Sequence, residues 1–160
     1  MPQIDEHLKW CLKDTKRLVK TKPDLGLAQK HVKKSEYNYG VVQALERLKN
    51  YDWAFNVGFY AIYHCFLAIL AKHGYESRNQ ACTITVLHTL IKDKKLDLDK
   101  DLIIQFDTLD VEKNITNPTV RERRELFTYG VETSIDLQQL KKIKELILKV
   151  QRETIRILGE

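Results

Sequence analysis

Three arginines fall within four residues of one another in the last third of the chain, at Arg121, Arg123 and Arg124. An arginine guanidinium presents its N–H donors in a planar fork that matches two oxygens of a phosphate group. The cluster is therefore a candidate contact for an anion such as a nucleotide or an RNA backbone. Because Glu122 and Glu125 stand beside these arginines, a solvated helix face of balanced charge is the alternative interpretation.

Two further residues could take part in chemistry with such a ligand. Tyr129 follows Arg124 by five residues. Since the ordinary pKa of tyrosine is about 10, Tyr129 is expected to be protonated and a poor base near neutral pH. His64 lies inside an apolar segment, where it is either a core histidine bonded to a neighbouring helix or part of a ligand pocket. We predict that all five residues contribute to nucleotide or RNA binding and that none is catalytic.

The motifs of several other chemistries are missing from the sequence. It has no glycine-rich phosphate loop, no GxSxG and no HExxH. The five histidines are scattered, and the nearest cysteine–histidine pair that resembles zinc-site spacing, Cys82 with His88, is weak. The acidic run at 97–101 holds too few ligands for a calcium loop. We therefore predict no metal and no cofactor.

The segment at 54–71 dominates the predicted architecture. It has 18 residues without a formally charged side chain, in a protein of which 31% of residues are charged. Such a segment is either a membrane span or a helix buried on nearly all sides. Asn56, Tyr60, Tyr63 and His64 lie within it, and a buried polar group without a partner costs about 1–3 kcal/mol. The remaining predicted helices are amphipathic and need an apolar partner, so we predict a central bundle helix and no contact with a membrane.

Apolar residues recur at helical spacing along the rest of the chain. The pattern predicts helices over residues 3–20, 25–49, 53–73, 79–92 and 100–113, a helix from Asn117-Pro118 to about Tyr129, and a last helix to Leu158. Asp52 is the expected N-cap of the third helix, Gly74 the expected left-handed end of that helix, and Ser134 or Asp136 the expected cap of the last. The inward face of the last helix is predicted to hold Leu140, Ile143, Ile147, Val150 and Ile157, with Lys141, Lys142, Lys144, Lys149 and Arg152 outward. Without any useful run of period-two alternation, the fold class is all-α: a single-domain, antiparallel up-and-down bundle of five to seven helices.

The charge distribution and the cysteine content bear on the possible ligands and on the cellular compartment. The net charge of +5 arises within residues 1–50, which hold 11 Lys/Arg and 6 Asp/Glu. A basic face of this kind attracts nucleic acid, while a solvated lysine-rich helix surface is the alternative. Cys11, Cys65 and Cys82 make an odd count without regular spacing, and Cys65 and Cys82, in apolar helices, are expected to be buried free thiols. The first 20 residues do not resemble a signal peptide, so a reducing cytoplasm is the expected location.

Two segments resemble the HEPN family, the "higher eukaryotes and prokaryotes nucleotide-binding" helical domains, in its small prokaryotic and archaeal branch. Residues 59–77, FYAIYHCFLAILAKHGYES, are similar to the central family helix, in which an aromatic-Tyr-Ala-x-aromatic-His run leads to Lys-x-Gly-Tyr. Residues 124–130, RELFTYG, are similar to the Arg-x4-Tyr-Gly element of a later helix. The helix plan agrees over about residues 25–158, so the resemblance implies that residues 1–22 form an N-terminal helical addition to the family fold.

The resemblance implies an antiparallel helical bundle that usually forms a homodimer. Many members are encoded beside a minimal nucleotidyltransferase and form a toxin–antitoxin pair with it. Catalytic members are metal-independent ribonucleases with an Arg-x4-6-His motif, in which the arginine holds the scissile phosphate and the histidine transfers a proton.

This sequence departs from the catalytic motif at its histidine. No histidine follows His88, and the matching position is Tyr129. We therefore expect a non-catalytic HEPN-like module that binds a nucleotide or RNA, forms a homodimer and partners a minimal nucleotidyltransferase. The alternatives are a metal-independent ribonuclease with a degenerate motif and a purely structural protein-interaction dimer.

Overall fold

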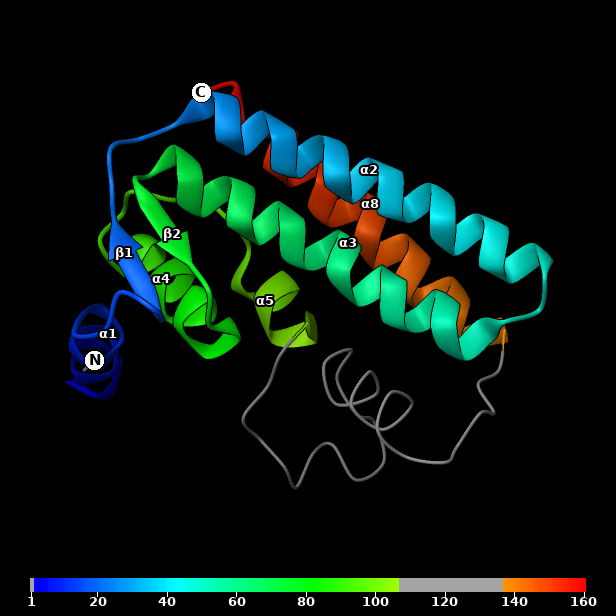
Figure 1. Cartoon of the computed structure of the whole chain (residues 1–160), viewed down its shortest axis with the longest axis horizontal. Helices are drawn as coiled ribbons and strands as arrows, with labels where there is room; N and C mark the ends of the chain where they lie inside the picture. Colours follow the sequence, from blue (N-terminus) through cyan, green and yellow to red (C-terminus); the bar gives the residue numbers. More distant parts are fainter. Residues whose placement is uncertain (1, 107–136) are drawn as a thin grey trace.

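Helix α3 (Tyr51–Lys72) is the central element of the fold. The structure, a computed structural model, describes residues 2–106 and 137–160. Twelve of the 22 residues of α3 are buried, because helices α2 (Leu25–Arg47) and α8 (Leu137–Leu158) lie along it (Figure 1). The prediction of an all-α helical bundle is confirmed, with six helices and one small sheet among the described residues.

Helix α3 is also the one described helix that is long and apolar enough to cross a membrane. Within its most apolar 18-residue window, 67% of the residues are buried inside the protein. Apolar side chains that are already enclosed by other helices leave little surface for lipid. This burial is consistent with a soluble protein.

The three long helices differ in direction. A short connection makes α2 and α3 antiparallel neighbours (Figure 1). Helix α8 runs parallel to α3, since Gly58 packs against Ile143 while Lys72 donates a hydrogen bond to the carbonyl of Ile157. A Cβ atom at Gly58 would lie 3.0 Å from Cδ1 of Ile143, so the small residue permits this close approach. The start of α8 therefore lies beside the first half of α3.

A two-stranded sheet joins the segments that flank α2 and α3. Strands β1 (Leu18–Lys20) and β2 (Tyr75–Ser77) are antiparallel, with Leu18 opposite Ser77. Gly74 has the predicted left-handed conformation, with φ of 81°. A Cβ atom there would lie 2.7 Å from the carbonyl oxygen of Thr21, so a side chain does not fit at the entry to the sheet.

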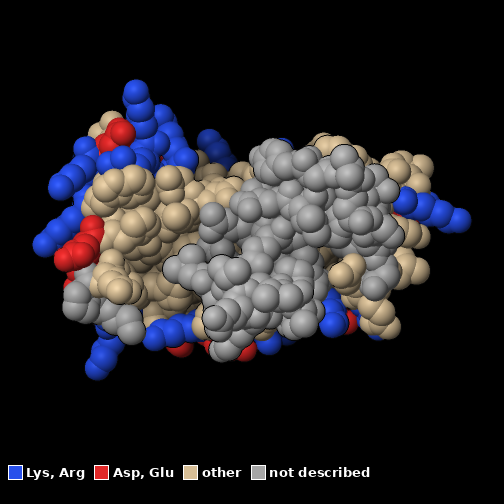
Figure 2. Space-filling model, turned by 90° about the horizontal axis from the view of Figure 1, so that it is seen from below, with Lys and Arg blue, Asp and Glu red and all other residues tan. Residues whose placement is uncertain are grey.

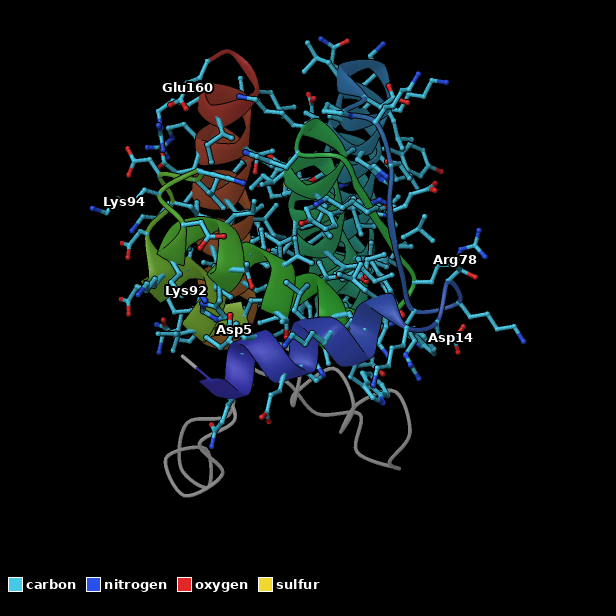
Figure 3. All side chains as sticks on the ribbon, turned by 90° about the vertical axis from the view of Figure 1, so that its left-hand side faces the viewer. Asp5, Asp14, Arg78, Lys92, Lys94 and Glu160 are labelled. Atoms are coloured by element: carbon cyan, nitrogen blue, oxygen red, sulfur yellow. A yellow bond between two sulfur atoms is a disulfide. The ribbon has the colours of Figure 1, made fainter. Side chains whose placement is uncertain are left out.

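Helix α4 (Gln80–Lys92) and helix α1 (Pro2–Leu12) pack together beside this sheet (Figure 3). The Asn79 side chain caps α4 by accepting a hydrogen bond from the backbone N–H of Cys82. Lys92 of α4 and Asp5 of α1 form a salt bridge, and both are labelled in Figure 3. The N-terminal segment is therefore fastened to α4 rather than to α2 or α3.

Several predicted boundaries are wrong at the N-terminal side. The helix predicted over 3–20 ends at Leu12, because Asp14 accepts hydrogen bonds from the backbone N–H groups of Lys16 and Arg17 and turns the chain into β1. A three-residue strand is too short to show a period-two pattern. Asp52 is not the cap of α3: Asn50 occupies that position, and Asp52 lies in the first turn.

Some of the other predicted helices lie among the residues that the structure describes, and others do not. The helices predicted over 25–49, 53–73 and 79–92 correspond to α2, α3 and α4 within two residues at each end. The helix predicted over 100–113 begins as α5 (Lys100–Phe106). The helix predicted after Asn117-Pro118 and the caps at Ser134 and Asp136 lie outside the described residues.

The predicted inward face of α8 is confirmed. Its members are all buried: Leu140, Ile143, Ile147, Val150 and Ile157. Of the five basic residues predicted to face outward, Lys144 is only half-exposed and donates a hydrogen bond of 2.7 Å to Glu46 near the end of α2. That pair adds a polar contact at the edge of the apolar α2–α8 interface.

The prediction that Cys82 is a buried free thiol is wrong. Cys11 of α1 and Cys82 of α4 form a disulfide, and both residues are fully buried. The sequence separation of 71 residues hid this pairing. Cys65 is free and buried, as predicted.

Phe106 anchors α5 on the central helix. Its ring stacks on Phe59 at a centroid distance of 4.7 Å and meets Phe66 edge to face at 5.1 Å. Tyr63 lies at the margin of the same cluster, 6.5 Å from Phe106. Such aromatic pairs add about 0.5–1.5 kcal/mol each to the burial of their surface.

We expect Phe106→Ala to lower the free energy of unfolding by about 3–5 kcal/mol, because it removes a fully buried ring. Denaturant unfolding followed by circular dichroism measures this change. Ile104→Ala is the matched control on the same helix: its side chain is 47% exposed, and a change of about 0.5 kcal/mol is expected. Equal losses in the two variants would contradict the packing of α5 on α3.

Candidate nucleotide-binding surface around His64

His64 of α3 forms a pair with His31 of α2. Their Nδ1 atoms are 3.0 Å apart, and the ring centroids are 5.2 Å apart. Both rings are half-buried between the two helices. The core-histidine interpretation of His64 therefore has a concrete partner on the neighbouring helix.

A buried polar network fixes the two helices next to this pair. Ser35, one turn after His31, donates a 2.6 Å hydrogen bond to the backbone carbonyl of Ala61. Gln151 of α8 donates a 2.9 Å hydrogen bond to the Ser35 hydroxyl. The Cys65 thiol lies 3.2 Å from the same oxygen, and burial raises the pKa of that thiol to about 11. All three long helices thus meet at Ser35, which sets the register that brings the histidines together.

The two histidines are neutral near pH 7. Burial, with smaller contributions from His31 and Lys34, lowers the pKa of His64 to about 4. Burial also lowers the pKa of His31, against the opposing effect of Glu76 on β2. Two cations at a separation of 3.0 Å would repel each other, which agrees with these directions.

Neutrality dictates how the pair hydrogen-bonds. One Nδ1 must carry the proton that the other accepts, so the two rings are in opposite tautomers. The Nε2 atom of the donor ring is then an acceptor, and the Nε2 atom of the acceptor ring is an N–H donor. In the described part of the chain neither Nε2 atom has a hydrogen-bond partner. The pair therefore offers one donor and one acceptor, the combination found on the edge of a nucleobase.

A lysine and two tyrosines flank the histidines. Lys34 is exposed, and its charge acts on His64. Its ammonium group lies 4.9 Å from the ring centroid of Tyr37, which is 64% exposed. Tyr60, one turn before His64, is 37% exposed. This face of α2 and α3 combines a cation with aromatic rings, two features that serve nucleotide binding.

Basic side chains gather at the end of the molecule that holds the sheet (Figure 2). Hydrogen bonding places Arg78 directly beside Arg17, and Lys20 lies in β1 opposite Tyr75. Arg17 lies over the Trp10 ring at 3.7 Å and donates a hydrogen bond to its carbonyl oxygen. We call Lys16, Arg17, Lys20, Lys22 and Arg78 the sheet-end basic cluster.

A separate groove lies between α2 and the end of α8. Its volume is about 350 Å³, and its lining includes Lys33, Glu36 and Ile155. Neither His31 nor His64 borders it. The groove therefore adds nothing to the surface around the histidine pair.

Four of the five predicted site residues, Arg121, Arg123, Arg124 and Tyr129, lie outside the described residues. His64 is the fifth, and it is brought together with His31 and Lys34 rather than with any predicted partner. The sequence held only a partial signal for His31. The tight turn between helices 25–49 and 53–73 places residues at similar distances from it at the same level of the helix pair, and the register of the two helices decides which of them meet.

No model of a known protein family matches the chain, and no curated protein matches it.

The histidine pair predicts a specific dependence of stability on pH. Because the folded pKa of His64, about 4, lies below its ordinary value of 6.5, the unfolded chain binds the proton first as pH falls. The contribution of His64 to stability is therefore complete above pH 6.5 and is lost as pH falls toward 4. We expect His64→Gln to flatten the decline of the melting temperature across this window, measured by thermal circular dichroism.

Lys149→Gln, which changes an exposed residue of α8 and removes no histidine, serves as the control. Its melting temperature should decline with the wild-type slope. Parallel curves for the wild type and His64→Gln would contradict a neutral, desolvated pair.

Proposed function

We propose that this protein is a non-catalytic, HEPN-like module that binds a nucleotide or RNA. The observation that carries the proposal is the neutral His31–His64 pair beside Lys34 and Tyr60. The pair presents a donor and an acceptor, the lysine supplies a positive charge for phosphate, and the tyrosine supplies an aromatic edge. The sheet-end basic cluster adds charge that would attract an extended polyanion such as RNA.

The lowered pKa of His64 argues against acid–base catalysis by this residue. A general base or acid works best when its pKa lies near the operating pH. The pKa of His64, about 4, leaves it fully deprotonated and weakly basic near neutrality. Together with tyrosine at position 129 in place of the catalytic histidine, this favours binding over ribonuclease activity.

The partners that we propose are those implied by the resemblance to the HEPN family. We propose a homodimer that associates with a minimal nucleotidyltransferase in the cytoplasm. Arg121, Arg123, Arg124 and Tyr129 would take part in ligand binding, with the arginines contacting its phosphates.

Binding of fluorescently labelled single-stranded RNA and of nucleotides tests the ligand class. We expect RNA affinity to fall linearly with salt on a double-logarithmic plot, since phosphate contacts release counterions. Lys34→Ala and Arg124→Ala should each weaken binding and reduce the salt slope by about one. Lys149→Ala, an exposed lysine of α8, is the matched control and should bind like the wild type.

Two outcomes would overturn this assignment. Cleavage of RNA in the presence of a chelator, abolished by Arg124→Ala, would make the protein a ribonuclease. Absence of RNA and nucleotide binding at low salt would leave the structural dimer as the function. Tyr129→Phe should change binding little, and Tyr129→His is expected to introduce slow cleavage by restoring the base.

Self-association is tested independently of the ligand. We expect sedimentation at micromolar concentration to show a species near twice the chain mass of 18.8 kDa. A species that stays at the chain mass would remove the homodimer from the proposal and leave the binding surface of one chain in place.

A further inference from the structure

We propose that His7, Cys11 and Cys82 form a redox-controlled site for a thiophilic divalent metal ion such as Zn²⁺. In the dithiol form, the two thiolates and one imidazole nitrogen bind the ion. In the disulfide form, the sulfurs bond to each other and the ion is released. The described structure shows the second of these states.

The three ligand atoms already lie together. Nδ1 of His7 and the sulfurs of Cys11 and Cys82 are all within 4.8 Å of one another. His7 precedes Cys11 by four residues on α1, so both side chains share one helix face, and Nδ1 lies 3.9 Å from the Cys11 sulfur. In a tetrahedral zinc site with bonds of about 2.3 Å to sulfur and 2.0 Å to nitrogen, these separations would be about 3.5–3.8 Å. Nδ1 is therefore already close to the separation from the Cys11 sulfur that a shared ion requires.

The cysteine backbone positions also suit an ion. The Cα atoms of Cys11 and Cys82 are 5.8 Å apart. Opening the sulfurs to about 3.8 Å requires rotation of the two side chains rather than separation of α1 from α4. The Lys92–Asp5 salt bridge holds the same two helices together independently of the sulfurs.

Thr85 completes the surroundings of the site. Its hydroxyl oxygen lies 2.6 Å from Nδ1 of His7. Metal binding at this nitrogen would replace the hydrogen bond, so the Thr85 hydroxyl would have to rotate away from Nδ1. Three protein ligands of this kind with one open position match the ligand types that zinc prefers.

The two states interconvert by a balanced reaction. A low-molecular-weight disulfide accepts two electrons from the two metal-bound thiolates and becomes two thiolates itself. The Cys11–Cys82 bond forms, and the metal ion leaves with its charge unchanged. Each thiolate that binds metal must first lose its proton, so binding to the reduced protein releases protons.

Cobalt provides the test, because Co²⁺ bound to thiolates in a tetrahedral site has a charge-transfer band and intense visible bands. The full-length protein is reduced, freed of reductant without oxygen and titrated with Co²⁺. We expect one Co²⁺ per chain, displacement by Zn²⁺ and loss of the bands when a low-molecular-weight disulfide is added. The oxidised protein should show no such bands.

Variants assign the ligands. Cys11→Ser and Cys82→Ser should abolish the thiolate bands. His7→Ala keeps both cysteines and should weaken binding by at least about tenfold, since even loss of an outer hydrogen-bond partner costs that much. Cys65→Ala, which removes the buried thiol of the helix core, is the control and should bind Co²⁺ like the wild type.

The proposal is overturned if the reduced wild type shows no thiolate–cobalt bands, which would leave a structural disulfide alone. It is also overturned if the oxidised protein binds Co²⁺ equally well, or if Cys65→Ala loses the bands. Circular dichroism of each variant separates loss of the site from loss of the fold. His7→Ala retains the disulfide when oxidised, so it remains informative if the serine variants unfold.

Discussion

The enclosure of α3 is the constraint on which the rest of the structure depends. A helix that carries no charged side chain between residues 54 and 71 must be covered on nearly every side in water. Helices α2 and α8 cover two sides, and the aromatic contact of Phe106 brings α5 to a third. The apolar faces of these helices pack against the apolar surface of α3.

Enclosure also decides how the polar groups of α3 behave. Tyr63 meets the hydroxyl of Thr83 at 3.0 Å, and burial raises the pKa of its phenol. The carbonyl of Ala61 accepts from Ser35, and His64 meets His31. Each of these three groups therefore has a partner from another helix, and the same desolvation that demands a partner removes the positive charge from His64. The neutral state of the histidine pair in the proposed binding surface thus results from the packing of the core.

The parts of this fold that follow from local patterns could be predicted, and the parts that depend on distant contacts could not. The 3.6-residue periodicity located α2, α3 and α4, and the buried residues of α8 followed from the same rule. Strand β1 was not predicted from the sequence, because its stability comes from pairing with β2, more than 50 residues away. The Cys11–Cys82 bond was not predicted for the same reason. The four-residue spacing of His7 and Cys11 indicates that both lie on one helix face, but it does not point to Cys82. At the candidate site, His64 was identifiable from its apolar surroundings, whereas His31 required the register of α2 against α3.

The position of the small sheet has a consequence for the order of folding. Leu18 and Ser77 are far apart in sequence, so closing that loop directly carries a large entropic cost. Helices α2 and α3 are joined by a short turn, and their contacts are local. Once this hairpin exists, Thr21 and Gly74 are already neighbours, as their 2.7 Å backbone hydrogen bond shows. The effective loop then shrinks to a few residues, so the rate at which the β1–β2 pair forms is set by the hairpin and not by the length of chain between the strands.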